Sequence, residues 1–187
     1  MNRSRMMVLV SVFLSAMWVH AQKTNATVPK SEDRASLPAP EMQKLYNAFV
    51  GSWQVTETFE ISTERQGKAR KGTARFRTTP GRSLIEEYRS TGSAGSLSLM
   101  ALFWWDPSAQ IYRLLTCANN DGCQLRGTAR WDGKELVNSW EEDVNGTSAK
   151  FNDSFVDLSP SSFRLVSEGT AEGKTIWRVI TRYKRVH

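Results

Sequence analysis

The chain has 187 residues, 40% of them hydrophobic, which is enough for one domain with a proper core, and its formal net charge of +6 is a mild excess. No recognisable nucleic-acid-binding module accompanies that charge, so a nucleic-acid partner is not expected. The two histidines, His20 and His187, lie near the chain ends. Catalysis by a Ser-His-Asp or Cys-His arrangement and histidine-bound zinc are therefore not expected either.

Residues 1–21 predict a secretory signal peptide. A basic start at 2–5 precedes an apolar stretch at 6–19, and a small-residue cleavage site follows, which places cleavage after Ala21. The apolar stretch is short for a membrane span and no later segment approaches its length, so stable membrane insertion is not expected. We expect a secreted or periplasmic protein that has lost the two arginines of its leader.

Residues 22–40 are polar and contain several prolines, which predicts a disordered linker. The pattern changes over Glu41 to Val50, where apolar residues recur at helical spacing. Pro40 suits the start of a helix and Gly51 suits its end. One short amphipathic helix should therefore precede the rest of the domain.

From Gly51 onward the chain reads as about ten strands separated by turn signals. The run 97–105 is more continuously apolar, as expected of a strand covered on both faces. Asp132–Gly133 and Asn145–Gly146 are signals for two-residue hairpins. The expected strands are 53–61, 72–79, 83–90, 97–105, 111–117, 123–131, 135–141, 148–158, 162–169 and 174–185.

Two connections have features of their own. The basic run 65–71 lies between two strand patterns and predicts a solvated hairpin loop rather than a site for an anionic lipid or polymer. Cys117 and Cys123 flank a turn-rich segment, which in an exported protein predicts a disulfide clamping that hairpin. In the chain-entropy model, closing so small a loop contributes roughly 2 kcal/mol. The spacing fits neither a Cys-x-x-Cys redox site nor a paired-cysteine zinc site.

Ten antiparallel strands with short links must either close into a barrel or protect two edges. Barrels near this strand number leave room for a ligand. A two-sheet sandwich is the main alternative, and the simple hairpin order favours the barrel. We therefore expect an all-β fold over residues 41–187, an up-and-down antiparallel β-barrel of about ten strands, with the short helix lying across one open end.

The segment Gly51–Ser52–Trp53, after a short helix and at the mouth of the first strand, resembles the Gly-x-Trp start of lipocalin-like (calycin) proteins. In those proteins the tryptophan packs at the base of the barrel, often under a basic side chain from the last strand. The resemblance implies this role for Trp53, with Arg178 or Arg182 as its cover.

Three segments occurring in order resemble a bacterial family known as domain of unknown function 1579, which is similarly built of barrel strands. They are Phe49–Trp53 (FVGSW), Gly81–Tyr88 (GRSLIEEY) and Phe103–Ser108 (FWWDPS). The likeness spans roughly Leu45 to the C-terminus. It implies a lipocalin-like barrel and no particular activity, because the family name states none.

The lumen of such a barrel is the expected binding site. Glu57 shares an alternating face with Trp53, one of Glu86 and Glu87 must point inward, and Asp153 lies between two phenylalanines. Inward acids need water, an arginine or a ligand. A structural ion-pair network is favoured over acid–base catalysis. Its candidate partners are Arg75, Arg126, Arg178 and Arg182. The lumen candidates are Trp53, Glu57, Phe59, Glu86, Tyr88, Trp105, Trp140, Asp153 and Arg182.

The aromatic content suits a pocket for apolar, flat or glycan ligands, with an ordinary packed core as the alternative. A haem barrel with an axial histidine is not expected, because the mature chain has only the terminal His187. The leading hypothesis is an exported, non-enzymatic barrel, monomeric or homodimeric, that binds a small hydrophobic ligand with no cofactor or metal. The alternatives are a hydrolase or isomerase using inward carboxylates such as Glu57, and an envelope protein-interaction module using the 65–77 hairpin.

Overall fold

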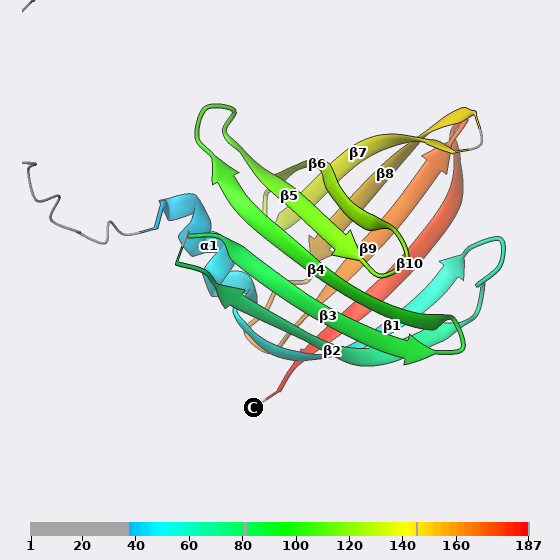
Figure 1. Ribbon diagram of the computed structural model, residues 1–187, viewed down its shortest axis with the longest axis horizontal. Coiled ribbons are helices and arrows are strands. Elements are labelled where there is room, and N and C mark those ends of the chain that lie inside the picture. Colours follow the sequence, from blue (N-terminus) through cyan, green and yellow to red (C-terminus); the bar gives the residue numbers. More distant parts are fainter. Residues whose placement is uncertain (1–37, 81, 145, 187) are drawn as a thin grey trace, which may run out of the picture. The chain divides into compact units, whose positions relative to one another are not determined.

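The structure is a computed structural model and describes residues 38–80, 82–144 and 146–186. The predicted signal peptide and most of the predicted linker lie outside these residues. Within them, one helix, α1 (Pro40–Phe49), is followed by ten strands (Figure 1). The strands are β1 (Gly51–Ile61), β2 (Ala69–Thr78), β3 (Leu84–Gly92), β4 (Gly95–Asp106), β5 (Ile111–Ala118), β6 (Gly122–Asp132), β7 (Glu135–Val144), β8 (Thr147–Val156), β9 (Ser162–Ala171) and β10 (Lys174–Arg185).

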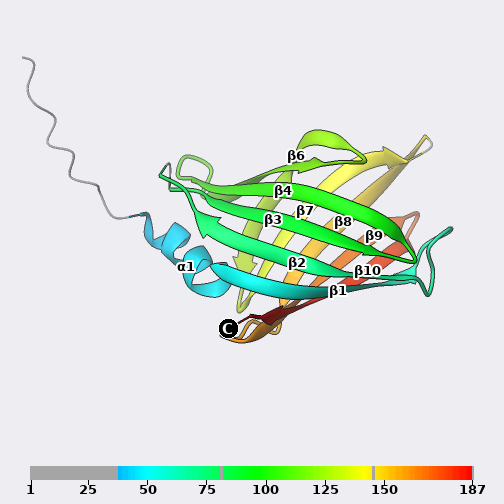
Figure 2. The same cartoon turned by 60° about the horizontal axis from the view of Figure 1, so that its bottom comes forward.

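The strands form one closed antiparallel barrel, and the predicted fold class is confirmed (Figure 2). Each strand pairs with its neighbours in the chain, and β1 pairs with β10 from Trp53↔Arg185 to Ile61↔Arg178. Closure removes both sheet edges, which is why the barrel rather than the two-sheet sandwich accommodates ten strands with short links.

Two local predictions are wrong. The second strand begins at Ala69 rather than Gly72, so Arg70 belongs to β2 and is buried instead of lying in a solvated loop. The run 97–105 is not covered on both faces, since Met100 on the outer side of β4 is 39% exposed. The apolar residues on the outer side of this strand face solvent, which is common on protein surfaces.

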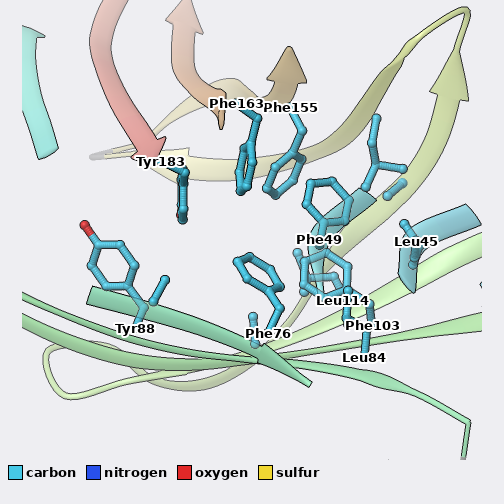
Figure 3. Close-up of a cluster of buried hydrophobic side chains, with 14 of the residues drawn as sticks. Leu45, Phe49, Phe76, Leu84, Tyr88, Phe103, Leu114, Phe155, Phe163 and Tyr183 are labelled. Carbon is cyan, nitrogen blue, oxygen red and sulfur yellow. The ribbon is translucent and has the colours of Figure 1, made fainter. Parts of the chain in front are cut away.

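The helix closes one end of the barrel, as predicted. Its apolar face, Met42, Leu45 and Phe49, is buried in the same core as the inward side chains of the strands (Figure 3). The ring of Phe49 stacks on Phe76 at 5.6 Å and meets Phe163 edge-on at 5.2 Å. Burial of these large side chains supplies the hydrophobic stabilisation that a short helix lacks on its own.

The indole of Trp53 fixes the helix to the first strand. Its Nε1–H donates to the Phe49 carbonyl at 2.9 Å, and its ring meets Phe163 edge-on at 4.8 Å. Because the last carbonyls of a helix lack partners within the helix, this bond satisfies one of them. The position of Trp53 at the base of the barrel agrees with the role implied by the lipocalin-like resemblance.

The cover of Trp53 is Arg185, so the expectation of Arg178 or Arg182 is wrong. The Arg185 guanidinium lies 4.2 Å from the Trp53 ring centre, and its Nη1 donates to the Val50 carbonyl at 2.8 Å. The register between β1 and β10 is the reason, because it sets Arg185 opposite Trp53. Arg178 instead lies opposite Ile61, and Arg182 is exposed on the outer surface.

The same guanidinium explains the first residue of the Gly51–Ser52–Trp53 segment. Gly51 has a φ of +146°, and a Cβ on it would lie 2.1 Å from Arg185 Nη1. The backbone conformation therefore favours glycine, and a larger residue would also displace the Arg185 guanidinium from its place over Trp53.

At the other end of the barrel, Cys117 and Cys123 pair across β5 and β6 and form the predicted disulfide.

We expect Arg185→Ala to lower the free energy of unfolding by about 1–2 kcal/mol, because it removes a cation–π contact and a hydrogen bond to a helix-terminal carbonyl. The matched control is Arg182→Ala, an exposed arginine on the same strand, which should change it by no more than about 0.5 kcal/mol. Urea unfolding followed by tryptophan fluorescence measures both. Equal effects of the two variants would contradict the assignment of Arg185 as the cover.

Candidate functional site

The lumen is not filled along its whole length. Beyond the aromatic core beneath α1, it contains a cavity of about 280 Å³. In the described part of the chain, every one of the ten strands contributes at least one residue to its wall. The cavity is thus the interior of the barrel, close to the lower size limit of ordinary ligand sites.

The predicted lumen residues divide into three groups. Those that line the cavity are Glu57, Phe59, Glu86, Tyr88, Trp140 and Asp153. Trp53 and Trp105 lie in or against the core at the closed end, where Trp105 packs on the Tyr112 ring at 5.0 Å. Arg182 is exposed, so its predicted inward orientation is wrong. On β10 the cavity is lined by Trp177, Val179, Thr181 and Tyr183, and Arg182 belongs to the opposite face of the strand.

Glu57 is held in a closed set of contacts. Arg70 Nε donates to its Oε2 at 3.2 Å, Arg70 Nη2 forms an ion pair with its Oε1, and the Tyr88 hydroxyl donates to its Oε2 at 2.8 Å. The side chains of Glu57 and Arg70 are each 6% exposed. The strand register places these two residues opposite each other. Both carboxylate oxygens are therefore occupied, which favours a structural role over acid–base catalysis.

The partner of Glu57 differs from those expected. Arg75, Arg126, Arg178 and Arg182 were the predicted partners, whereas the structure uses Arg70. The error follows from reading 65–71 as a loop, because a loop residue would not face a position in the middle of β1.

Glu86 is also buried, but its carboxyl group has fewer hydrogen-bond and ion-pair partners than that of Glu57. It is 5% exposed, and the Tyr183 hydroxyl donates to its Oε1 at 3.1 Å. Burial raises the pKa of Glu86 to about 7, the Tyr183 hydrogen bond acts in the opposite direction, and the nearby charge of Asp153 raises it further. No arginine or lysine between residues 38 and 186, among those the structure describes, forms an ion pair with it.

Asp153 resembles Glu86 in lining the cavity and accepting a hydrogen bond from one hydroxyl group. The Ser167 hydroxyl donates to its Oδ1 at 2.5 Å. Burial raises the pKa of Asp153 to about 6, against the lowering effects of that hydrogen bond and of the Arg126 charge. Arg126 itself is engaged in an ion pair with Asp121. The cavity therefore contains two carboxyl groups that are poorly compensated by positive charge.

Two other polar groups near these acids have no hydrogen-bond partner within the described chain. Asn138 is fully buried, and neither atom of its amide group is paired. Trp140, which lines the cavity, has an unpaired and buried Nε1–H. Asn138 was missed in the sequence, although it alternates with Leu136 and Trp140 on β7, and this alternation is a signal that could have identified it.

Charged residues also surround the end of the cavity opposite α1. Arg65 belongs to the β1–β2 connection, and Asp121 to the β5–β6 connection; both line the cavity. Arg65 lies 5.8 Å from the Phe59 ring centre and Arg126 lies 5.4 Å from the Trp140 ring centre. The arginines of this rim thus rest on aromatic side chains of the wall.

Across the described ranges, no group of three or more His, Cys, Asp or Glu side chains is placed to hold a metal ion. No helix among the described residues has the length and apolarity needed to cross a membrane.

No protein-family model matches the sequence, and no curated protein matches it. Solved structures with a similar chain include the redesigned β-barrel mFAP0 bound to DFHBI, at 14% identity and a TM-score of 0.42, with 74% of this chain and 99% of that chain covered. Another, a fluorescence-activating β-barrel designed de novo, is 15% identical with a TM-score of 0.39, over 74% and 94% of the two chains. Similarities this distant give no indication of function.

The raised pKa of Glu86 makes stability depend on pH. The folded state binds a proton at this site more tightly than the unfolded chain, so the free energy of unfolding should fall as pH rises from about 4.5 to about 7. Glu86→Gln keeps an acceptor for Tyr183 without the charge. We expect this variant to be more stable than the wild type at pH 8, by on the order of 3 kcal/mol at most, and similar to it near pH 4.5.

Urea unfolding at pH 4.5 and pH 8 measures this difference. Glu87→Gln is the matched control, because Glu87 adjoins Glu86 on β3 but is half-exposed and pairs only with Arg77 at the surface. Its effect should stay within about 1 kcal/mol at both pH values. A Glu86→Gln variant that is less stable than the wild type at pH 8 would show that the ionised carboxylate is compensated in the fold.

Proposed function

We propose that this protein is an exported β-barrel that binds a small, largely apolar molecule in its lumen. One observation carries the proposal: side chains fill only the closed end of the barrel, and a cavity of about 280 Å³ remains within the wall formed by all ten described strands. Proteins pack their interiors densely, so an unfilled volume bounded by so many strands is unusual for a purely structural core.

The chemistry of the wall supports an apolar ligand oriented by a few polar groups. Phe59, Trp140 and Trp177 present aromatic surface, and leucines from β4, β5 and β9 add aliphatic surface. Aromatic rings favour flat or apolar bodies, while a small number of polar groups fix orientation in such sites. Glu86, Asp153 and the unpaired Nε1–H of Trp140 are polar groups of the wall that have capacity left for a ligand.

Occupation of the lumen is tested with N-phenyl-1-naphthylamine, a neutral and largely apolar fluorophore. We expect saturable fluorescence enhancement with one site per chain. Ala101 lines the cavity and is buried, so Ala101→Phe should fill the space and weaken binding by roughly tenfold or more. Its neighbour Met100 points outward on the same strand, and Met100→Phe should bind as the wild type does.

Circular dichroism establishes that both variants are folded. Absence of binding to the wild type, or equal binding by a folded Ala101→Phe variant, would overturn the proposed lumen site.

Export and membership of the lipocalin-like family are part of the same proposal. The leader predicted at residues 1–21 supports export, and the Cys117–Cys123 disulfide is typical of an oxidising compartment. Trp53 at the barrel base beneath Arg185 supports the family resemblance.

For export, we expect bacterial expression of the full chain to give a periplasmic or secreted protein whose N-terminus is Gln22. Its cysteines should react with a maleimide only after reduction. N-terminal sequencing and mass spectrometry of labelled protein measure both properties. Retention of the leader, together with thiols that react before reduction, would contradict the proposal.

A further inference from the structure

The charged residues of the cavity do not balance one another. Its wall and rim contain the acids Glu57, Glu86, Asp121 and Asp153 and the bases Arg65, Arg70 and Arg126. Glu57 pairs with Arg70, and Asp121 pairs with Arg126. The remaining base, Arg65, lies in the β1–β2 connection at the rim. Glu86 and Asp153 form no ion pair among the described residues, and the charge of Arg126, which pairs with Asp121, offsets that of Asp153 only in part.

These two acids are close enough for the charge of one to disfavour the ionisation of the other. Each accepts one hydroxyl hydrogen bond, from Tyr183 and from Ser167 respectively. A carboxylate can accept about four hydrogen bonds, so both have capacity left. Two acids that face one cavity and form no ion pair of their own are costly to ionise, and a bound cation would offset that cost.

The surroundings of the acids are suited to an organic cation rather than to a bare ion. Phe155 lines the cavity two positions from Asp153 on β8, and Tyr183 lines it beside Glu86. Aromatic faces attract cations and also bury apolar groups. Asn138, opposite Asp153 in the β7–β8 register, is fully buried with both amide atoms unpaired, so hydrogen-bonding capacity is left unused beside Asp153.

We propose that the lumen selects a protonated amine with an apolar, preferably aromatic body, and that the ammonium group lies between Glu86 and Asp153. This inference rests on the proposed function, because it requires that the lumen binds a small molecule. An ammonium group has three donors, so it can donate to more than one carboxylate oxygen. The apolar body then occupies the aromatic part of the cavity, and an anionic ligand of the same shape is repelled.

The test uses isothermal titration calorimetry at pH 8 to compare three ligands that each have a phenyl ring on a four-carbon chain: 4-phenylbutylamine, 4-phenylbutan-1-ol and 4-phenylbutyrate. We expect the amine to bind on the order of tenfold or more tightly than the alcohol, and the carboxylate to bind most weakly. In the double variant Glu86→Gln/Asp153→Asn, the amine should bind no more tightly than the alcohol, whose affinity should be retained. Glu87→Gln, outside the lumen, should keep the wild-type preference.

The possible results separate the two proposals. If the alcohol binds the wild type but the amine binds no better, or if the double variant keeps the preference for the amine, the inference about charge is overturned while lumen binding stands. If none of the three ligands binds, the lumen-binding proposal is overturned together with it. Alcohol binding by the double variant also establishes that this variant has folded.

Discussion

Pairing of the first strand with the last is the interaction on which the rest of the structure depends. Because β1 and β10 join, the sheet has no free edge, and one set of alternating side chains encloses an interior. The register of this pair also sets Arg185 over Trp53 and thereby closes the base of the barrel. A shift of one residue would exchange inward and outward faces, so the same register determines which side chains reach the lumen.

The two ends of the lumen are built differently. At one end α1 adds Leu45 and Phe49 to the inward rings of the strands, giving a dense core. Toward the other end charged and polar side chains join the apolar ones, and the space between them is not filled. The dense end stabilises the fold. This stability offsets the unfavourable placement of Glu86 and Asp153 in the wall of the cavity. Positions that break the rules of core packing in this way are often functional sites.

The fold could be predicted from the sequence because its signals are local. Alternation, hairpin turns and the helix boundaries each lie within a few neighbouring residues, and they identified the helix, ten strands and a disulfide. Alternation also placed Glu57, Glu86 and Asp153 in the lumen. Apart from the start of β2 and the covering of 97–105, the failures concern contacts between distant parts of the chain. Arg185 over Trp53, and Arg70 opposite Glu57, depend on strand register, which no local pattern specifies. On β10, the adjacent apolar residues Val179 and Ile180 obscure the alternation, and Arg182 was assigned to the wrong face.

The acids of the lumen differ in how far their charge is neutralised, so the interior is polar and also has an incompletely compensated negative charge. Glu57 is neutralised by Arg70 and fixed by Tyr88, so it adds polarity to the wall without net charge. Glu86 and Asp153 accept hydrogen bonds from hydroxyl groups and form no ion pair among the described residues, so their ionisation leaves negative charge on the wall of the cavity. Electrostatic interactions are strong in such surroundings. If the lumen binds small molecules as proposed, shape and apolar surface admit many of them, and the sign of the remaining charge decides which of them is retained.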